Sequence, residues 1–268
     1  MNVGLVAVAV AVLGCSPETA RQSPPAATRP GATPAPREPS ALDALLDYVP
    51  PDALAIVAID LEQARRSPAL IRGLERLLAQ IGHDLPAGAR ALVIARVAAG
   101  AKEPPADLLI LAESSAPRLL GPPAVIERAN AAHLGASIVE AGELRDALAA
   151  ARGDNAAFGA VQMTESLRTA ARAMSPDLAT ATWVTGSLAV ASGITLTGIG
   201  AFPDLTTSTR VAAAVDLGKS FALGELRSKD PVAARAIEKL FARPVGSTLR
   251  VTATFNEAEA AALLGLLL

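Results

Sequence analysis

Ala53-Leu-Ala-Ile-Val-Ala-Ile59 is an uninterrupted apolar run with the length of one β-strand. A run without polar residues at every second position predicts a central strand that is buried on both faces of its sheet. Val49-Pro50-Pro51 stands before it and ends a short helix expected from Ala41 to Tyr48, because proline cannot continue a helix. We therefore expect the folded region to begin near Ser40, with residues 53–59 inside its sheet.

A helix is expected directly after this strand. Asp60-Leu61-Glu62-Gln63 fits a capping pattern, in which a carboxylate at the strand end accepts hydrogen bonds from the first turn of the helix. Ser67 and Pro68 fit the cap and first position of a second helix that continues to about Gln80. This second helix presents one apolar face at helical spacing, made of Leu70, Ile71, Leu74, Leu77, Leu78 and Ile81.

The second part of the chain carries the same signals. Residues 157–163 predict another apolar strand, and Thr164 fits the cap of a helix that follows it. Residues 194–202 and 247–255 alternate between apolar and polar side chains, which predicts strands with one exposed face. Asn256-Glu-Ala-Glu259 is a capping box that opens a final helix.

The order of these elements predicts an α+β fold with mainly antiparallel sheets. The two leading strands start about a hundred residues apart, at Ala53 and Ala157, which indicates an internal duplication and not a solenoid repeat. With a short strand expected at 136–140, each half resembles the split β-α-β, or ferredoxin-like, arrangement. The predicted halves are residues 41–153 and 154–268. Their sheets could join edge to edge or pack helix layer to helix layer, and the sequence leaves both open.

The composition excludes several classes of function. Hydrophobic residues make up 51% of the chain and charged residues 19%, as in a folded protein. A formal net charge of −2 leaves no basic footprint, so we expect no nucleic-acid partner. Aromatic residues make up only 3%, which also disfavours stacking on single-stranded nucleic acid or on carbohydrate.

The N-terminal segment, residues 1–15, has the features of an export signal. Its apolar run, Val3 to Gly14, is shorter than the roughly 20 residues needed to span a bilayer, but suits the hydrophobic region of a signal peptide. The run ends in Val12-Leu13-Gly14-Cys15, which resembles the lipobox of bacterial lipoproteins. This resemblance implies that Cys15 carries a diacylglycerol and begins the mature chain, and that Ser16 is compatible with the outer membrane. An ordinary cleaved signal and an apolar N-terminal helix are the alternatives.

Residues 16–40 are rich in Pro, Ala, Ser and Thr and contain no large apolar side chain, so they cannot form a packed core. We expect a disordered tether. In an extended polyproline geometry of about 3.1 Å per residue, it would reach roughly 75 Å from the anchor. Because Cys15 is the only cysteine, the chain forms no internal disulfide and the fold must depend on its core.

The opening of the folded region also resembles that of uncharacterised bacterial surface proteins. The resemblance rests on Val49-Pro-Pro-Asp-Ala-Leu-Ala-Ile-Val-Ala-Ile-Asp60 followed by Ser67-Pro68. It supports the predicted fold and implies no activity.

Motifs that would carry catalysis or bind a cofactor are weak. His83 and His133 are the only histidines and stand about fifty residues apart, which predicts no metal site. No G-x-S-x-G elbow is present. Gly218-Lys219-Ser220 imitates the end of a phosphate-binding P-loop, but Ala213 occupies the place of the earlier glycine and the segment predicts a helix. We therefore expect no cofactor.

Asp60 and Glu62 are the remaining candidates for a cleft, because the junction of a strand and a helix faces a cleft in many folds. A helix N-terminus also stabilises these side chains simply as caps.

The sequence thus predicts a cell-envelope protein that is not an enzyme. Its anchor at Cys15 would hold it in a membrane, with the outer membrane facing the periplasm favoured, and its α+β domain would bind an envelope protein or act as a scaffold. One alternative is a carrier that holds a lipid or another apolar ligand in a cleft between the halves. Another is a carboxylate-dependent enzyme using Asp60 and Glu62. The oligomeric state is not predicted.

Overall fold

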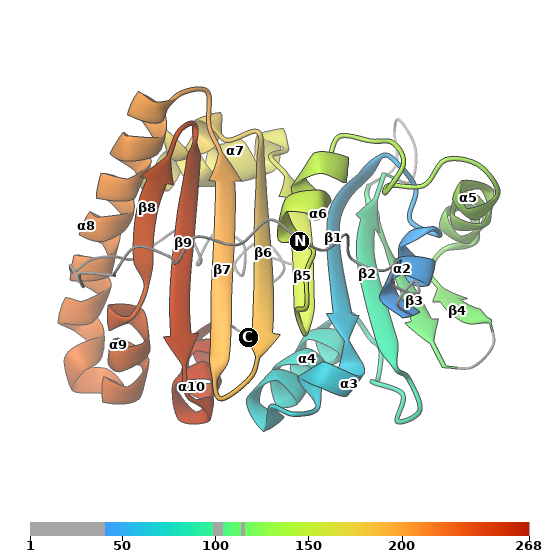
Figure 1. Ribbon diagram of the computed structural model, residues 1–268, viewed down its shortest axis with the longest axis horizontal. Helices are drawn as coiled ribbons and strands as arrows, with labels where there is room; N and C mark the ends of the chain where they lie inside the picture. Colours follow the sequence, from blue (N-terminus) through green and yellow to red (C-terminus); the bar gives the residue numbers. More distant parts are fainter. Residues whose placement is uncertain (1–40, 99–103, 114–115, 268) are drawn as a thin grey trace, which may run out of the picture.

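One antiparallel sheet of nine strands runs through the protein, in the order β4-β3-β2-β1-β5-β6-β7-β9-β8 (Figure 1). The computed structural model describes residues 41–98, 104–113 and 116–267. The strands are β1 (Ala53–Asp60), β2 (Ala91–Val97), β3 (Ala106–Ala112), β4 (Pro117–Leu120), β5 (Ala157–Gln162), β6 (Trp183–Val190), β7 (Ile194–Ala201), β8 (Phe241–Val245) and β9 (Thr248–Phe255).

Helices complete the predicted α+β class. They are α2 (Ala41–Leu46), α3 (Leu61–Ala64), α4 (Pro68–Gln80), α5 (Pro123–Leu134), α6 (Arg145–Ala151), α7 (Glu165–Met174), the 3₁₀ helix η1 (Leu178–Thr180), α8 (Leu205–Lys229), α9 (Pro231–Glu238) and α10 (Glu257–Leu267). Ser67 caps α4 by accepting a hydrogen bond from the Leu70 N–H at 3.2 Å, as predicted. The capping box of α10 is also confirmed, because Asn256 and Glu259 each accept from the other's backbone N–H.

The two halves join edge to edge, through β1 and β5. These strands pair antiparallel from Ala55 opposite Val161 to Ile59 opposite Ala157. β1 also pairs with β2 along its whole length, so it lies inside the sheet as its apolar sequence predicted. The join makes one continuous sheet out of the two predicted sheets.

The structure does not confirm the ferredoxin-like arrangement. β1 and β2 are direct antiparallel neighbours although α3 and α4 lie between them in the chain, whereas a β-α-β unit places its two strands parallel. The segment 81–90 leads from the end of α4 back to the start of β2, next to the end of β1. The chain therefore re-enters the sheet at the end it left.

Two strands were not predicted, and two local predictions were wrong. β4 and β8 are short strands at the two sheet edges, and each contains a proline, which weakened their strand signal. Residues 136–140 form no strand but end in a turn at 138–140, with Ile138 buried and its N–H donating to Val49 O at 2.9 Å. Thr164 precedes α7, but its hydroxyl contacts Ser166 Oγ at 3.2 Å and makes no cap.

The sheet of the first half is covered on both faces. Side chains along β2 alternate between two hydrophobic clusters: Val93 packs in the cluster of α2, α5 and α6, whereas Leu92 and Ile94 pack in the cluster of α3 and α4. Most side chains on both faces of these strands are buried, which explains their mainly apolar sequences.

The sheet of the second half is covered on one face. Every second residue of β9, from Leu249 to Phe255, packs in one cluster with residues of α8, α9 and α10. The residues between them, Thr248, Arg250, Thr252 and Thr254, are half-buried or exposed. In Figure 1, α2 stands in front of strands of the first half and α6 in front of β5, whereas no helix stands in front of β7 or β9. The alternation predicted for these strands is confirmed.

Replacing Gly159 by alanine should damage the join between the halves. A Cβ at Gly159 in β5 would lie 2.5 Å from the carbonyl oxygen of Ile56 in β1, so the strands would have to separate. We expect a loss of about 1–3 kcal/mol in the free energy of unfolding, the usual range for overpacking. Urea unfolding of the full chain, followed by the fluorescence of the only tryptophan, Trp183, measures it.

Gly186→Ala is the matched control. Gly186 lies directly opposite Gly159 in β6, and its Cβ would meet Thr197 O at 3.8 Å, an ordinary contact. A change in stability as large for Gly186→Ala as for Gly159→Ala would contradict this view of the join.

Candidate functional site

Asp60 and Glu62, the carboxylates singled out from the sequence, lie in one pocket of about 240 Å³. The pocket is also lined by Arg90 and by the first residues of α2. Asp60 Oδ1 accepts from the Gln63 N–H at 3.0 Å and Oδ2 accepts from the Gln63 side chain at 3.1 Å, so both oxygens are used at the start of α3. The structure therefore gives Asp60 a capping role and leaves Glu62, which is exposed, beside it.

Cys15 and the tether, residues 16–40, lie outside the described residues. Within the described ranges, no helix is long and apolar enough to cross a bilayer. The same ranges contain no group of three or more potential metal ligands.

The ring of His133 stacks on the ring of Tyr48, with centroids 4.0 Å apart, so this histidine has a packing contact.

Lys219, the residue that imitates a P-loop lysine, is completely buried in the middle of α8. Its Nζ donates to Glu238 O at 2.8 Å, at the end of α9, and to Leu240 O at 3.1 Å, two residues further on. Burial raises the pKa of the nearby Asp216, against an opposing effect of Lys219. Ionisation of Asp216 thus opposes folding as the pH rises from its unfolded to its folded pKa. The lysine therefore holds α8 to the end of α9, and its ammonium group donates hydrogen bonds inside the protein.

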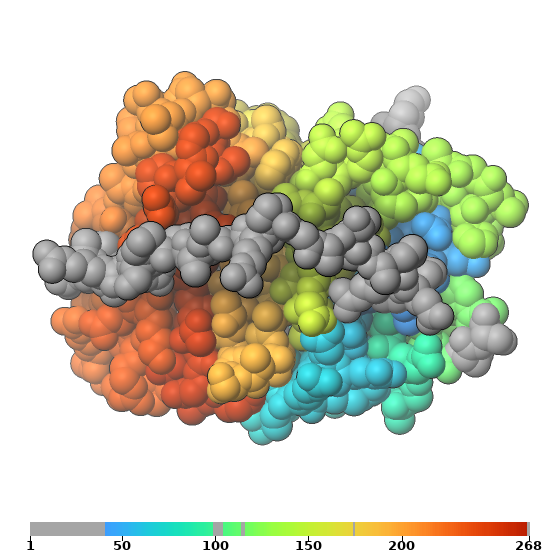
Figure 2. Space-filling model, in the orientation of Figure 1, coloured from blue at the N-terminus to red at the C-terminus, as the bar shows by residue number. Residues whose placement is uncertain are grey.

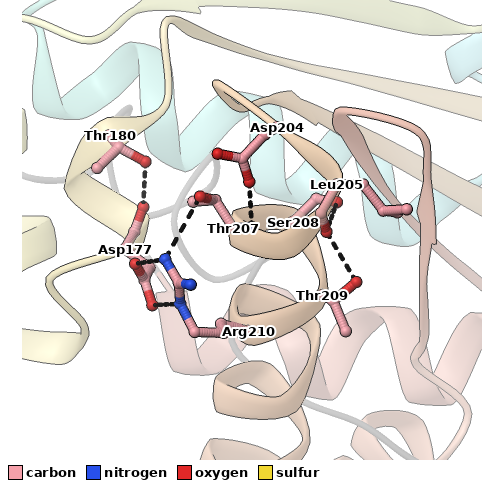
Figure 3. A network of polar contacts seen from close by, with 8 residues as sticks. All are labelled: Asp177, Thr180, Asp204, Leu205, Thr207, Ser208, Thr209 and Arg210. Carbon is pink, nitrogen blue, oxygen red and sulfur yellow. Dashed lines mark hydrogen bonds and ion pairs between the residues drawn. The ribbon is translucent and has the colours of Figure 1, made fainter.

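Figure 3 shows a second polar network, at the start of α8. Arg210 donates to both carboxylate oxygens of Asp177 at 2.8 Å, which ties α8 to the segment before η1. These hydrogen bonds hold the pKa of Asp177 below its usual range. Asp204 caps α8 by accepting from the Thr207 N–H at 2.7 Å, and this bond lowers the pKa of Asp204. Ser208 Oγ donates to Gly246 O at 2.9 Å, in the turn between β8 and β9. The hydrogen bonds of Arg210 and Ser208 therefore hold the start of α8 to the segment before η1 and to the turn between β8 and β9.

This network predicts acid sensitivity. Asp177 and Asp204 have folded pKa values below their unfolded ones, so their stabilising contribution is present above about pH 4 and is lost as the pH falls through the folded values. Replacing Arg210 by glutamine should return the pKa of Asp177 toward its ordinary value. The fall in urea midpoint between about pH 5 and pH 3 should then be shallower.

Arg227→Gln is the control, because it breaks an ion pair with Glu238, at 3.3 Å, between two exposed side chains. The slope of midpoint against pH should match that of the natural chain. If the urea midpoint of Arg210→Gln falls with pH as steeply as that of the natural chain, the assigned role of Asp177 is contradicted.

A large polar surface lies on the side of the second half that the described helices leave open. We call it the uncovered face. It is formed by the half-buried and exposed outward residues of β6 to β9: Ser187, Ala189, Thr195, Thr197, Ile199, Ala201, Phe241, Arg243, Val245, Thr248, Arg250, Thr252 and Thr254. None of these residues belongs to a hydrophobic cluster of the described chain. Figure 2 shows orange and red residues of this half at the surface on the same side.

The charge on the uncovered face is one-sided. Its only charged residues are Arg243 and Arg250, and both are exposed. They stand directly opposite one another on β8 and β9. Like charges in this position destabilise a sheet, and no carboxylate of the face compensates them.

A pocket of about 200 Å³ lies where the uncovered face meets the end of α6. Arg250 and hydroxyl residues of β6 and β7 line it from the sheet, and Arg152 and Asn155 line it from the end of α6. Thr185, also in the lining, is only 2% exposed, and its hydroxyl has no hydrogen-bond partner among the residues that the structure describes. Arg152 is paired with Asp43 at 2.6 Å.

The sequence did not identify this site. The alternation in residues 194–202 and 247–255 indicated an exposed face, but Arg243 lay outside the predicted strands and no local signal placed it opposite Arg250. Which strands are neighbours is decided by chain segments far apart in sequence.

No protein-family model matches this chain, and comparison with curated proteins and with solved structures gives no significant match. The geometry of the uncovered face and its pocket is therefore the basis for a functional assignment.

Proposed function

We propose that this chain is a lipid-anchored cell-envelope protein whose domain binds an acidic segment of another envelope protein on the uncovered face, without catalysis. The observation that carries the proposal is the pair Arg243 and Arg250, exposed and directly opposite one another with no carboxylate on the same face.

An acidic partner would relieve the electrostatic repulsion between Arg243 and Arg250. Two guanidinium groups on adjacent strands repel one another, and each offers a fork of N–H donors that fits a carboxylate. Neither side chain has an ion pair or side-chain hydrogen bond within the described chain. Binding of carboxylates would therefore replace water on these groups without breaking an existing contact.

The rest of the uncovered face suits a protein surface. Phe241 and Val245 are 43% and 54% exposed, next to the arginine pair on the edge strand β8. Threonine hydroxyls extend across β7 and β9, with Thr195 and Thr254 in contact at 3.3 Å. Arginine and aromatic residues surrounded by polar groups are typical of protein interfaces.

The proposed anchor is the lipobox-like cysteine, Cys15, with residues 16–40 as the tether to the domain. A reach of roughly 75 Å would let the domain meet a partner well away from the membrane. The outer membrane facing the periplasm is the favoured location, as the residue after the cysteine suggests.

We also infer that the domain arose by internal duplication. β1 and β5 begin the two halves and pair with each other, and the next two strands follow outward in the same order on each side. Beyond them the halves differ, since β9 and β8 extend the second half whereas β4 ends the first.

The two alternatives have less support. A carrier needs an apolar cleft between the halves, but Phe158 and Ala160 of β5 pack into the core of the first half, across the join. Both pockets described above are smaller than the roughly 300–1,000 Å³ of typical ligand sites, and charged residues line them. An enzyme using Asp60 would need a carboxylate that is not already held as a helix cap.

Cross-linking in intact cells tests the partner. A photoreactive amino acid at Thr252, on the uncovered face, should give a discrete adduct whose cross-linked partner peptide carries net negative charge. Arg243→Glu and Arg250→Glu should each remove most of this adduct, because they turn attraction into repulsion.

Arg76→Glu is the control with the same change of charge. Arg76 is exposed on α4, which packs on other surfaces of the sheet. Equal loss of the adduct in all three variants, or a neutral or basic partner peptide, would contradict the proposal.

Replacing Cys15 by serine tests the anchor. The natural chain extracted from membranes in mild detergent should begin at Cys15 and carry the added mass of acyl groups in native mass spectrometry. Cys15→Ser should lack this mass and leave the membrane fraction. An unmodified natural chain would exclude the anchor, and additional labile apolar mass on the folded domain would favour the carrier.

A further inference from the structure

The pocket of about 200 Å³ between α6 and the uncovered face has the properties of a site for one anionic group. This inference rests on the proposed function, since it names the chemistry by which the partner would be held. Three observations bear on it: the balance of charge around the pocket, an unsatisfied buried hydroxyl, and the size of the space.

The lining of the pocket is positive. It contains two arginines and no carboxylate. The charge of Arg152 is already compensated by Asp43, whereas Arg250 has no ion pair in the described chain. The guanidinium of Arg250 is thus the group available to a ligand, and its planar fork matches a carboxylate in two parallel hydrogen bonds.

Thr185 adds a donor at the same place. Its side chain is 98% removed from solvent, and Oγ1 has no partner among the described residues, although buried hydroxyls in proteins are nearly always paired. Ser187, two residues further along β6, and Thr197, opposite it on β7, supply further hydroxyls to the lining. A ligand acceptor atom would satisfy a hydroxyl that folding leaves without a bond.

The size of the pocket restricts what can enter. With about 30 Å³ for each water in the liquid, 200 Å³ corresponds to roughly seven waters. This space fits the end of one acidic side chain and excludes a folded segment or an acyl chain.

We propose that this pocket binds one side-chain carboxylate of the acidic partner. Arg250 donates the bidentate pair of hydrogen bonds, and the hydroxyl of Thr185 donates a third. A carboxylate suits the site better than a phosphate, because one free guanidinium balances a single negative charge.

A titration with a minimal probe tests the pocket directly. N-acetyl-glutamate amide, added to the isotope-labelled full chain in detergent, should shift the backbone amide signals of Thr185 and Ser187 with a saturable Kd of about 1–10 mM, as expected for one anchored group. The neutral isostere N-acetyl-glutamine amide should give no saturable shift. Saturation by inorganic phosphate without saturation by the carboxylate probe would overturn the assignment.

Three variants separate this pocket from simple attraction to positive charge. Arg250→Gln should weaken probe binding by about tenfold or more. Thr185→Val, which keeps the shape and removes the hydroxyl, should weaken it about fivefold. Arg243→Gln is the matched control on the same face but outside the pocket lining, and should change Kd by less than about twofold.

Thr185→Val also carries a second readout. If its hydroxyl lacks a partner in the free protein, the variant should raise the urea midpoint while it weakens binding. A lower urea midpoint for Thr185→Val would contradict the proposed binding site. So would an equal loss of probe affinity in Arg243→Gln and Arg250→Gln together with an unchanged affinity in Thr185→Val. The adduct could then still depend on both arginines, as the proposed function requires. The opposite result is also informative. If the probe binds as expected but the cross-linked adduct at Thr252 is unchanged in Arg243→Glu and Arg250→Glu, the pocket stands and the proposed protein partner is excluded.

Discussion

The antiparallel pairing of β1 with β5 is the interaction on which the rest of the structure depends. It turns the leading strands of the two halves into neighbours, so that nine strands form one sheet. Pairing at this seam satisfies the backbone groups that two separate sheets would each leave at an open edge. It also brings Phe158 and Ala160 into the core of the first half, so the seam is closed by side chains as well as by the backbone.

Unequal helix cover follows from this continuous sheet. In the first half, clusters on both faces bury the strands, and their sequences are mainly apolar. In the second half, α8, α9 and α10 pack with one face, and threonines and arginines occupy the other. The pocket lies where α6 ends on the sheet, between the part that is covered on both faces and the part that is covered on one. Its hydroxyls come from the sheet, and its arginines come from both sides of the boundary.

Much of the local structure could be predicted, because it depends on short-range chemistry. Ser67 and the pair Asn256 and Glu259 cap their helices as their spacing indicated, since a cap and its N–H partners lie within three residues. β4 and β8 could not be predicted in this way, because an edge strand pairs on one side and tolerates the proline that obscures its pattern. Asp60 lines a pocket, and both oxygens of its carboxylate accept hydrogen bonds from Gln63 at the start of α3, which is the capping role that its position also allowed.

The sequence by itself determined most of the strands and helices, the buried position of β1 inside the sheet, and the absence of an internal disulfide. Those properties follow from periodicity, capping and composition, which are written along the chain. Only the tertiary structure decided that the halves join edge to edge, that Arg243 lies opposite Arg250, and that Thr185 meets the end of α6. Strand order and register set these neighbours, and they depend on the packing of segments far apart in sequence.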